Sequence, residues 1–339
     1  MRRLVLHVGD CKTGSTILQT MLARGDCVPE GSRLFAPSGN QGALARSLGD
    51  RKALYPQRWN AIARRLDQAD WDVAVLSSEL FEFIKPDRVA EVVDKHLRPL
   101  ADQIKVIAYV RPHTGRIVSQ CAENLKLGHD TGTLAEFTER FLSRGRLDFA
   151  TRLGAWRGAF GDAFTMRPFQ RDRLTGGDIR RDFLAFVLDG APYTLTDSGQ
   201  DDNSALPVPD LALMRFLQAR FADMPQDNRV AFGKQFGRLL RRHLPTIPAD
   251  PLRLTEDLYD RIYPAARTDA ERLDAEWIDT PCFVPALEAA RDATIPLAQS
   301  LDAADHHSPE TLRLMTGWAD LIARQMTDDP KDFSRRLRT

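Results

Sequence analysis

The segment "LVLHVGDCKTGSTILQTML" (Leu4–Leu22) decides the fold class of this 339-residue chain. It begins with an apolar run, passes through a loop that contains Gly9, Lys12 and Gly14, and continues with a helical pattern. This order is typical of a buried strand that leads into a helix. Such a turn directs backbone N–H groups and the positive end of the helix dipole at one point. The segment therefore predicts an anion site at the end of a strand.

Three further β-rich runs follow in the chain, and helical patterns separate them. They are "VAVLSS" (73–78), "KVIAYV" (105–110) and "AFTMRPF" (163–169). Near-continuous apolar runs are typical of parallel strands that are buried on both faces. The alternation predicts an α/β fold with a central parallel sheet of four or five strands flanked by helices.

A polar stretch that contains proline, at 195–210, separates this alternation from the rest of the chain. Beyond it only helical patterns occur, and one of them opens with the start signal Ser308 to Glu310. We therefore expect residues 1–205 to form the α/β core. Residues 206–339 should form a helical C-terminal region that packs on the core as one unit.

The composition of the chain argues against some classes of function and predicts where in the cell the protein is located. Lys plus Arg and Asp plus Glu number 47 each, so no excess of positive charge indicates nucleic-acid binding. No apolar run approaches the roughly 20 residues of a membrane-spanning helix, and the first apolar run is too short for a signal peptide, which predicts a cytoplasmic protein. The chain has four cysteines, Cys11, Cys27, Cys121 and Cys282, and their spacing is not that of metal ligands. We therefore expect neither a metal site nor a disulfide framework.

The position of Lys12 argues against the common nucleotide-hydrolase loop. The Walker A pattern GxxxxGK[ST] places its lysine directly after the second glycine, whereas Lys12 precedes Gly14. The stretch "HVGDCKTGSTILQ" (7–19) instead resembles the 5′-phosphosulfate loop of sulfotransferases that use 3′-phosphoadenosine 5′-phosphosulfate (PAPS). That family's loop reads Pro-Lys-[Thr/Ser]-Gly-[Thr/Ser]-[Thr/Ser], and Cys11 stands where it has proline.

The resemblance implies roles for individual loop residues. Lys12 would stabilise the oxygen that leaves with the phosphate, in addition to binding the 5′-phosphosulfate. The residues expected to bind this group are Lys12, Thr13, Gly14, Ser15 and Thr16.

A second set of residues follows the run at 105–110. Arg111 stands at the predicted strand end and Ser119 eight residues later, early in the next helix. An arginine can bind a phosphate through two parallel hydrogen bonds, and a serine hydroxyl adds a donor. The same spacing in sulfotransferases is their 3′-phosphate motif, so the resemblance implies that both residues bind this phosphate. Arg116 also stands where the family often has a basic residue, and Cys121 where tyrosine is common.

Sulfuryl transfer needs a general base for the proton of the acceptor. Glu79 in "VLSSELFEF" follows the second predicted strand, at the edge where open α/β sheets bind ligands. Related glycan sulfotransferases have a glutamate base on the corresponding strand, so we expect Glu79 to be catalytic. His7 and His113 are competing candidates for the base.

The resemblance extends to about residue 210. The segment 164–190 resembles a segment of the sulfotransferase family. In this chain it contains three arginines that could line a path for a polyanion: Arg167, Arg171 and Arg173. Asn203 and Ser204 resemble a loop that follows it in relatives.

The resemblance implies a P-loop nucleotide-kinase-like fold and a PAPS-dependent sulfotransferase. The acceptor would be a hydroxyl group, possibly on a glycan or on a small molecule, and no metal is needed for this chemistry. Two other functions stay open at this point. One is a P-loop kinase or nucleotide hydrolase, and the other is a nucleotide- or glycan-binding protein of the same fold that has lost catalysis. The sequence leaves the oligomeric state and the identity of the acceptor undecided.

Overall fold

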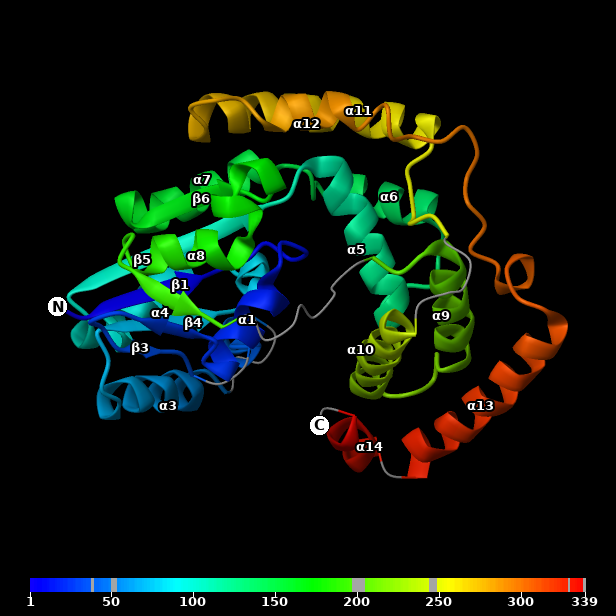
Figure 1. Cartoon of the computed structure of the whole chain (residues 1–339), viewed down its shortest axis with the longest axis horizontal. Helices are drawn as coiled ribbons and strands as arrows, with labels where there is room; N and C mark the ends of the chain where they lie inside the picture. The colour runs from blue at the N-terminus through cyan, green and yellow to red at the C-terminus, as the bar shows by residue number, and fades with distance from the viewer. Residues whose placement is uncertain (38–39, 50–53, 197–204, 244–248, 329, 338–339) are drawn as a thin grey trace. The chain divides into compact units, whose positions relative to one another are not determined.

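The computed structural model describes residues 1–37, 40–49, 54–196, 205–243, 249–328 and 330–337. A parallel five-stranded sheet forms the centre of its α/β part, with the strand order β3-β4-β1-β5-β6 (Figure 1). The predicted α/β fold with a central parallel sheet is therefore confirmed. The strands are β1 (Arg3–His7), β3 (Leu34–Phe35), β4 (Val73–Ser77), β5 (Gln103–Val110) and β6 (Phe164–Pro168).

The four predicted strands are present, with ends that differ by one or two residues from the sequence patterns. The fifth strand, β3, has only two residues and was missed, because so short a segment carries no periodic signal. A separate antiparallel pair, β2 (Cys27–Pro29) with β7 (Tyr193–Leu195), was missed for the same reason.

The position of β1 in the middle of the sheet sets the place of the site. His7, the last residue of β1, is in register with Ser77 on β4 and with Ile107 on β5. Because these strands are parallel, the loops that follow β1, β4 and β5 leave from the same edge of the sheet. Open α/β sheets bind their ligands at this edge.

Both faces of the sheet are covered, as the apolar strands require. Val5 of β1 packs in one cluster with Leu18 of α1 (Ser15–Arg24) and Phe183 of α8 (Ile179–Val187). Its neighbours Leu4 and Leu6, which point to the opposite face, are also buried. The other helices of this part are α2 (Gly42–Leu48), α3 (Tyr55–Gln68), α4 (Pro86–His96) and α7 (Phe149–Phe160).

The chain divides into two compact units, and it crosses between them several times. The first unit comprises Met1–Pro112, Asp148–Asp201 and Asp269–Val284, and the second comprises the remaining segments His113–Leu147, Asp202–Thr268 and Pro285–Thr339. The sequence analysis expected one boundary at residue 205 instead. The domain boundaries as such stay a prediction.

The second unit is helical, and among the described residues no strand follows β7. One of its clusters joins Leu217 and Phe221 to Phe232, Ala319 and Met326. None of the described helices is long and apolar enough to cross a membrane. The helices of the second unit are α5 (His113–Leu127), α6 (Leu134–Ser143), α9 (Val208–Arg220), α10 (Gln226–Arg242), the first part of α11 (Glu256–Trp277), most of α12 (Phe283–Ala289), α13 (Pro309–Asp328) and α14 (Pro330–Arg336).

Candidate functional site

Hydrogen bonds to the neighbouring strand β5 hold the first residues of the loop between β1 and α1. The Asp10 N–H donates to the Tyr109 carbonyl at 2.8 Å, and the Tyr109 N–H donates to the Gly9 carbonyl at 2.9 Å. Gly9 has a φ of 109°, and a Cβ atom there would lie 3.0 Å from the Glu79 carbonyl oxygen. Only glycine therefore lets this backbone pass so close to the segment after β4.

The second half of the loop folds tightly before the helix. Lys12 has a φ of 67°, in the left-handed region, and Gly14 follows at 79° as the N-cap of α1. The Thr13 hydroxyl donates to the Asp10 carbonyl at 2.6 Å and closes the turn. Among the described residues, none accepts a hydrogen bond from the backbone N–H groups of Ser15 or Thr16. These N–H groups and the helix dipole make the start of α1 suitable for an anion.

Ser15 adds an unusual feature to this turn. The residue is 6% exposed, and its buried hydroxyl oxygen has no hydrogen-bond partner in the described part of the chain. A buried hydroxyl without a partner costs about 1–3 kcal/mol. An anion bound at the start of α1 would provide that partner. Thr16, in contrast, is exposed at the same helix end.

A buried ion pair supports the loop from the side. Both oxygens of Asp10, which is 1% exposed, accept hydrogen bonds from the Arg152 guanidinium of α7, at 2.5 and 2.7 Å. Glu82 accepts a hydrogen bond of 2.9 Å from the Cys11 N–H. Burial alone would lower the pKa of Arg152, but Asp10 and Glu82 raise it above its usual value. Arg152 therefore stays charged and compensates a carboxylate that would otherwise repel an anion from this loop.

Glu79 lies half-buried at the start of a short 3₁₀ helix, η2 (Glu79–Phe83), directly after β4. Its carboxylate accepts hydrogen bonds from the side-chain amides of Gln19, at 2.9 Å, and Asn40, at 2.9 Å to each oxygen. Gln19 lies one turn after Ser15 on α1, which places both on the same face of the helix. Ser15 and Gln19 are about 6 Å apart along the axis of α1, judged from the rise of four residues.

His7 is fully buried beneath the loop, at 0% exposure. Its Nδ1 lies 2.8 Å from the Ser77 hydroxyl, and its ring packs edge-on against Tyr109 and Phe183. Burial lowers the pKa of His7 to about 4, so the ring is neutral near pH 7. An acceptor in solvent does not reach this ring, and its contacts indicate that it supports the loop.

Arg111 directly follows β5 and lies over the ring of Phe169, with its Cζ atom 5.1 Å from the ring centre. The same ring lies near the loop, because a Cβ atom on Gly14 would come within 3.3 Å of Phe169 Cε2. Phe169 therefore lies near both Gly14 and Arg111. A guanidinium can lie over an aromatic ring and bind a phosphate with its planar set of N–H groups.

Ser119 and His113 belong to α5 in the second unit. Ser119 is half-buried and His113 is 1% exposed. The joint 3′-phosphate site of Arg111 and Ser119 stays a prediction. Burial raises the pKa of the Cys121 thiol on the same helix to about 12, so this cysteine is a packing residue.

Two of the three arginines in and after β6 bond to groups of the protein itself. Arg167 donates at 2.6 Å to both carboxylate oxygens of the buried Asp182, so it holds α8 to the sheet. Arg173 donates to the Pro281 carbonyl at 3.3 Å, and Arg171 is exposed. Asn203 and Ser204 lie outside the described residues.

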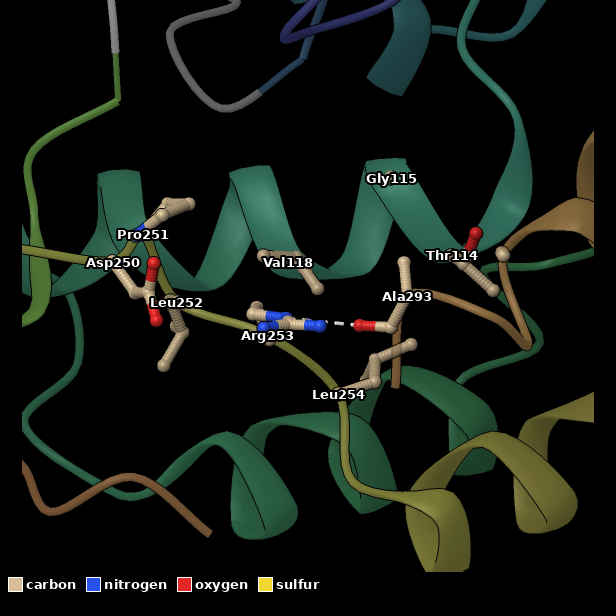
Figure 2. Close-up of a pocket in the computed structure, with 10 residues that line it drawn as sticks. Thr114, Gly115, Val118, Asp250, Pro251, Leu252, Arg253, Leu254 and Ala293 are labelled. Atoms are coloured by element: carbon tan, nitrogen blue, oxygen red, sulfur yellow. Dashed lines mark hydrogen bonds between the residues drawn. The ribbon is translucent and has the colours of Figure 1, made fainter. Parts of the chain in front are cut away.

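Among the described residues, no group of three or more His, Cys, Asp or Glu side chains is arranged to hold a metal ion. The second unit contains a pocket of about 450 Å³ between α5 and the segment 250–254. Figure 2 shows Val118 of α5 facing this segment, where Arg253 Nε donates to the Ala293 carbonyl at 2.9 Å. None of the predicted site residues lines this pocket.

The sequence analysis missed the side chains that hold the predicted ones in place. Asp10 and Arg152 are 142 positions apart in the chain, and no local pattern connects them. Asn40 was missed for the same reason. Only Gln19 had a signal, since its spacing of four residues from Ser15 predicts a shared helix face.

Comparisons with known proteins give one match among solved structures. No protein-family model matches this chain, and no curated protein matches at a significant level. The crystal structure of a sulfotransferase from Alicyclobacillus acidocaldarius is similar with a TM-score of 0.46 and 15% identity, over 85% of this chain and 99% of the other. Similarity at this level is too low to carry an argument about function. The assignment below rests on the residues of this chain.

Proposed function

We propose that this protein is a sulfotransferase that uses PAPS as the sulfuryl donor. The observation that carries the proposal is the arrangement at the start of α1. There, Lys12 lies in the loop that leads into the helix, and the buried hydroxyl of Ser15 has no partner among the described residues. One helical turn after Ser15, Gln19 donates a hydrogen bond to the carboxylate of Glu79. An anion site next to a carboxylate that is held by two amides suits transfer of a charged group to a hydroxyl.

In the proposed reaction PAPS supplies the sulfuryl group. Glu79 accepts the proton of the acceptor hydroxyl as the acceptor oxygen bonds to sulfur. Lys12 stabilises the negative charge that develops on the 5′-phosphate oxygen when its bond to sulfur breaks. The N–H groups of Ser15 and Thr16 and the Ser15 hydroxyl bind the 5′-phosphosulfate, while Thr13 and Gly14 shape the turn.

We assign the 3′-phosphate to Arg111 and Ser119. The support for Arg111 is its position at the carboxyl end of β5 and its stacking on Phe169 beside the loop. The support for Ser119 is the sequence spacing alone. An enzyme with this pair should bind the 3′-phosphorylated nucleotide better than one that lacks this phosphate.

A calorimetric titration with 3′-phosphoadenosine 5′-phosphate tests the nucleotide, with ATP plus Mg²⁺ as the comparison. We expect the 3′-phosphorylated nucleotide to bind at least tenfold more tightly. Lys12→Ala should weaken this binding, whereas Lys95→Ala, at an exposed position on α4, should not. Preference for ATP plus Mg²⁺ would support the kinase alternative and reject our proposal.

Turnover separates an enzyme from a binding protein of the same fold. Sulfuryl transfer from PAPS should be measured with a panel of sugar, phenol and alcohol acceptors. We expect Glu79→Gln to bind 3′-phosphoadenosine 5′-phosphate normally and to lose turnover by about 100-fold or more, the range of a general base. Normal turnover in this variant would remove Glu79 as the base, and no transfer to any acceptor by the unmodified protein would favour the binding protein.

A further inference from the structure

Helix α13 has two apolar faces, and the described residues cover one of them. Figure 1 shows the course of the helix. On the covered face, Ala319 and Met326 are buried against residues of α9 and α10. On the other face, Leu314, Trp318 and Leu321 are 55%, 62% and 58% exposed. Their spacing of four and three residues places them in one stripe along the helix. Single exposed apolar side chains are common, but a contiguous stripe indicates an interaction surface.

Gly317 interrupts this stripe in the middle of the helix. Glycine in a helix interior costs about 1 kcal/mol relative to alanine. A Cβ atom at this position would meet no atom within 4 Å, so packing within the described chain does not require the glycine. A missing side chain on an exposed helix face lets another helix approach closely.

Charged residues stand at the two ends of the stripe. Glu310 lies in the first turn of α13 and Arg324 in the fifth, and both are exposed. Neither forms an ion pair among the described residues. The face that we call the α13 stripe therefore has an acid at one end, a cation at the other, and Leu314, Gly317, Trp318 and Leu321 between them.

We propose that the α13 stripe binds the α13 stripe of a second copy of this chain, as an antiparallel pair about a two-fold axis. In this register Leu314 of each copy faces Leu321 of the other, and Trp318 of each copy covers Gly317 of the other. Glu310 comes within one residue, about 1.5 Å of helix rise, of the position opposite Arg324 of the second copy. The surface is thus complementary to itself in both shape and charge.

The charges beside the stripe disfavour a membrane as the partner. Arg313, Asp320 and Arg324 flank the apolar side chains, and Asp328 ends the helix, so the two signs are balanced. Helices that bind anionic membranes carry an excess of Lys and Arg on the polar face. One helix pair also covers less than the roughly 800 Å² per partner of a standard interface, so we expect a micromolar dissociation constant for the dimer.

Sedimentation of the full chain from about 1 to 200 µM tests the dimer. We expect a concentration-dependent monomer–dimer equilibrium that Trp318→Lys weakens by at least tenfold. Leu297→Lys is the matched control, because Leu297 is 80% exposed and lies outside the stripe. A monomer at all concentrations would overturn the proposal, as would equal effects of the two substitutions.

Charge reversal tests the orientation of the two helices. Glu310→Arg and Arg324→Glu alone should each raise the dissociation constant, because like charges then face each other. The double variant restores opposite charges at both ends, and it should return to within about threefold of the unmodified chain. An additive effect in the double variant would contradict the antiparallel register. Binding of the monomer to vesicles with one-third anionic lipid, abolished by Trp318→Lys, would assign the stripe to a membrane and overturn the proposal.

Discussion

The side-chain amide of Gln19 donates a hydrogen bond of 2.9 Å to the Glu79 carboxylate. One helix, α1, therefore carries the predicted anion site at its first turn and orients the predicted base from its second turn. The same amide also donates to the Ser77 hydroxyl at 3.3 Å, which joins the base to the end of β4. The Gln19 amide thus links the predicted base to both α1 and β4.

Replacing Gln19 with leucine should reduce catalysis without reducing nucleotide binding. The leucine cannot hold the Glu79 carboxylate, so we expect kcat to fall by about 10- to 100-fold, as for a misplaced catalytic group. The KM for PAPS should change less than threefold. Gln57→Leu, at an exposed position on α3, serves as the control in the same steady-state assay. A rise in KM with an unchanged kcat would place Gln19 in nucleotide binding instead.

Replacing Ser15 with alanine distinguishes a ligand-binding hydroxyl from a structural one. The hydroxyl has no partner in the described chain, so its loss should leave the unfolding free energy unchanged or slightly higher. Affinity for 3′-phosphoadenosine 5′-phosphate should fall by about tenfold, the value of one hydrogen bond to a charged group. Urea denaturation and calorimetry on the same samples measure both. Lower stability with unchanged affinity would show a structural role.

Replacing Arg152 with methionine should destabilise the protein strongly. The substitution removes the guanidinium that pairs with the buried carboxylate of Asp10, and breaking a buried ion pair from one side typically costs about 3–5 kcal/mol. Adding Asp10→Asn removes the buried charge, so the double variant should recover part of this loss. Urea denaturation of the three variants provides the comparison. Equal stability of Arg152→Met and the unmodified protein would mean that the pair contributes little.

The buried His7 should make stability depend on pH below neutrality. Its folded-state pKa of about 4 lies below the value of 6.5 for an unfolded chain. Between these values the unfolded chain binds more protons, so stability falls as the pH falls, by about 1.4 kcal/mol per pH unit. Above pH 6.5 the histidine contributes no pH dependence. Urea denaturation from pH 7.5 to 4.5 should give a steeper loss for the unmodified protein than for His7→Gln. Parallel curves would contradict this account.

The sequence predicted the elements that repeat a pattern over several residues. The apolar runs that became β1, β4, β5 and β6 are four of the five strands of the sheet. The strand β3 has two residues, and its pairing with β4 depends on the neighbour and not on its own composition. The two compact units also depend on contacts between distant segments, which local composition does not encode.

For the site, the loop residues and Glu79 stay predictions from the sequence. The structure shows that the loop leads into α1 and that Gln19 of α1 donates to Glu79. The sequence could not predict Asn40 or Arg152, because their contacts arise only when the strands and helices have assembled. It also allowed Arg167 to line a polyanion path, and the structure shows that this arginine bonds to the buried Asp182. Residue type alone does not tell a ligand-binding arginine from one that neutralises an internal carboxylate.

The left-handed backbone of Lys12 bears on how the protein can be engineered. A residue with a side chain is less stable than glycine at these angles, by about 1–2 kcal/mol. Optimising the chain for heat resistance alone would therefore favour glycine at this position and remove the only lysine of the loop. Under the proposed function, Lys12 is thus a point where activity and thermal robustness oppose each other, and a stabilised variant should be designed with this residue held constant.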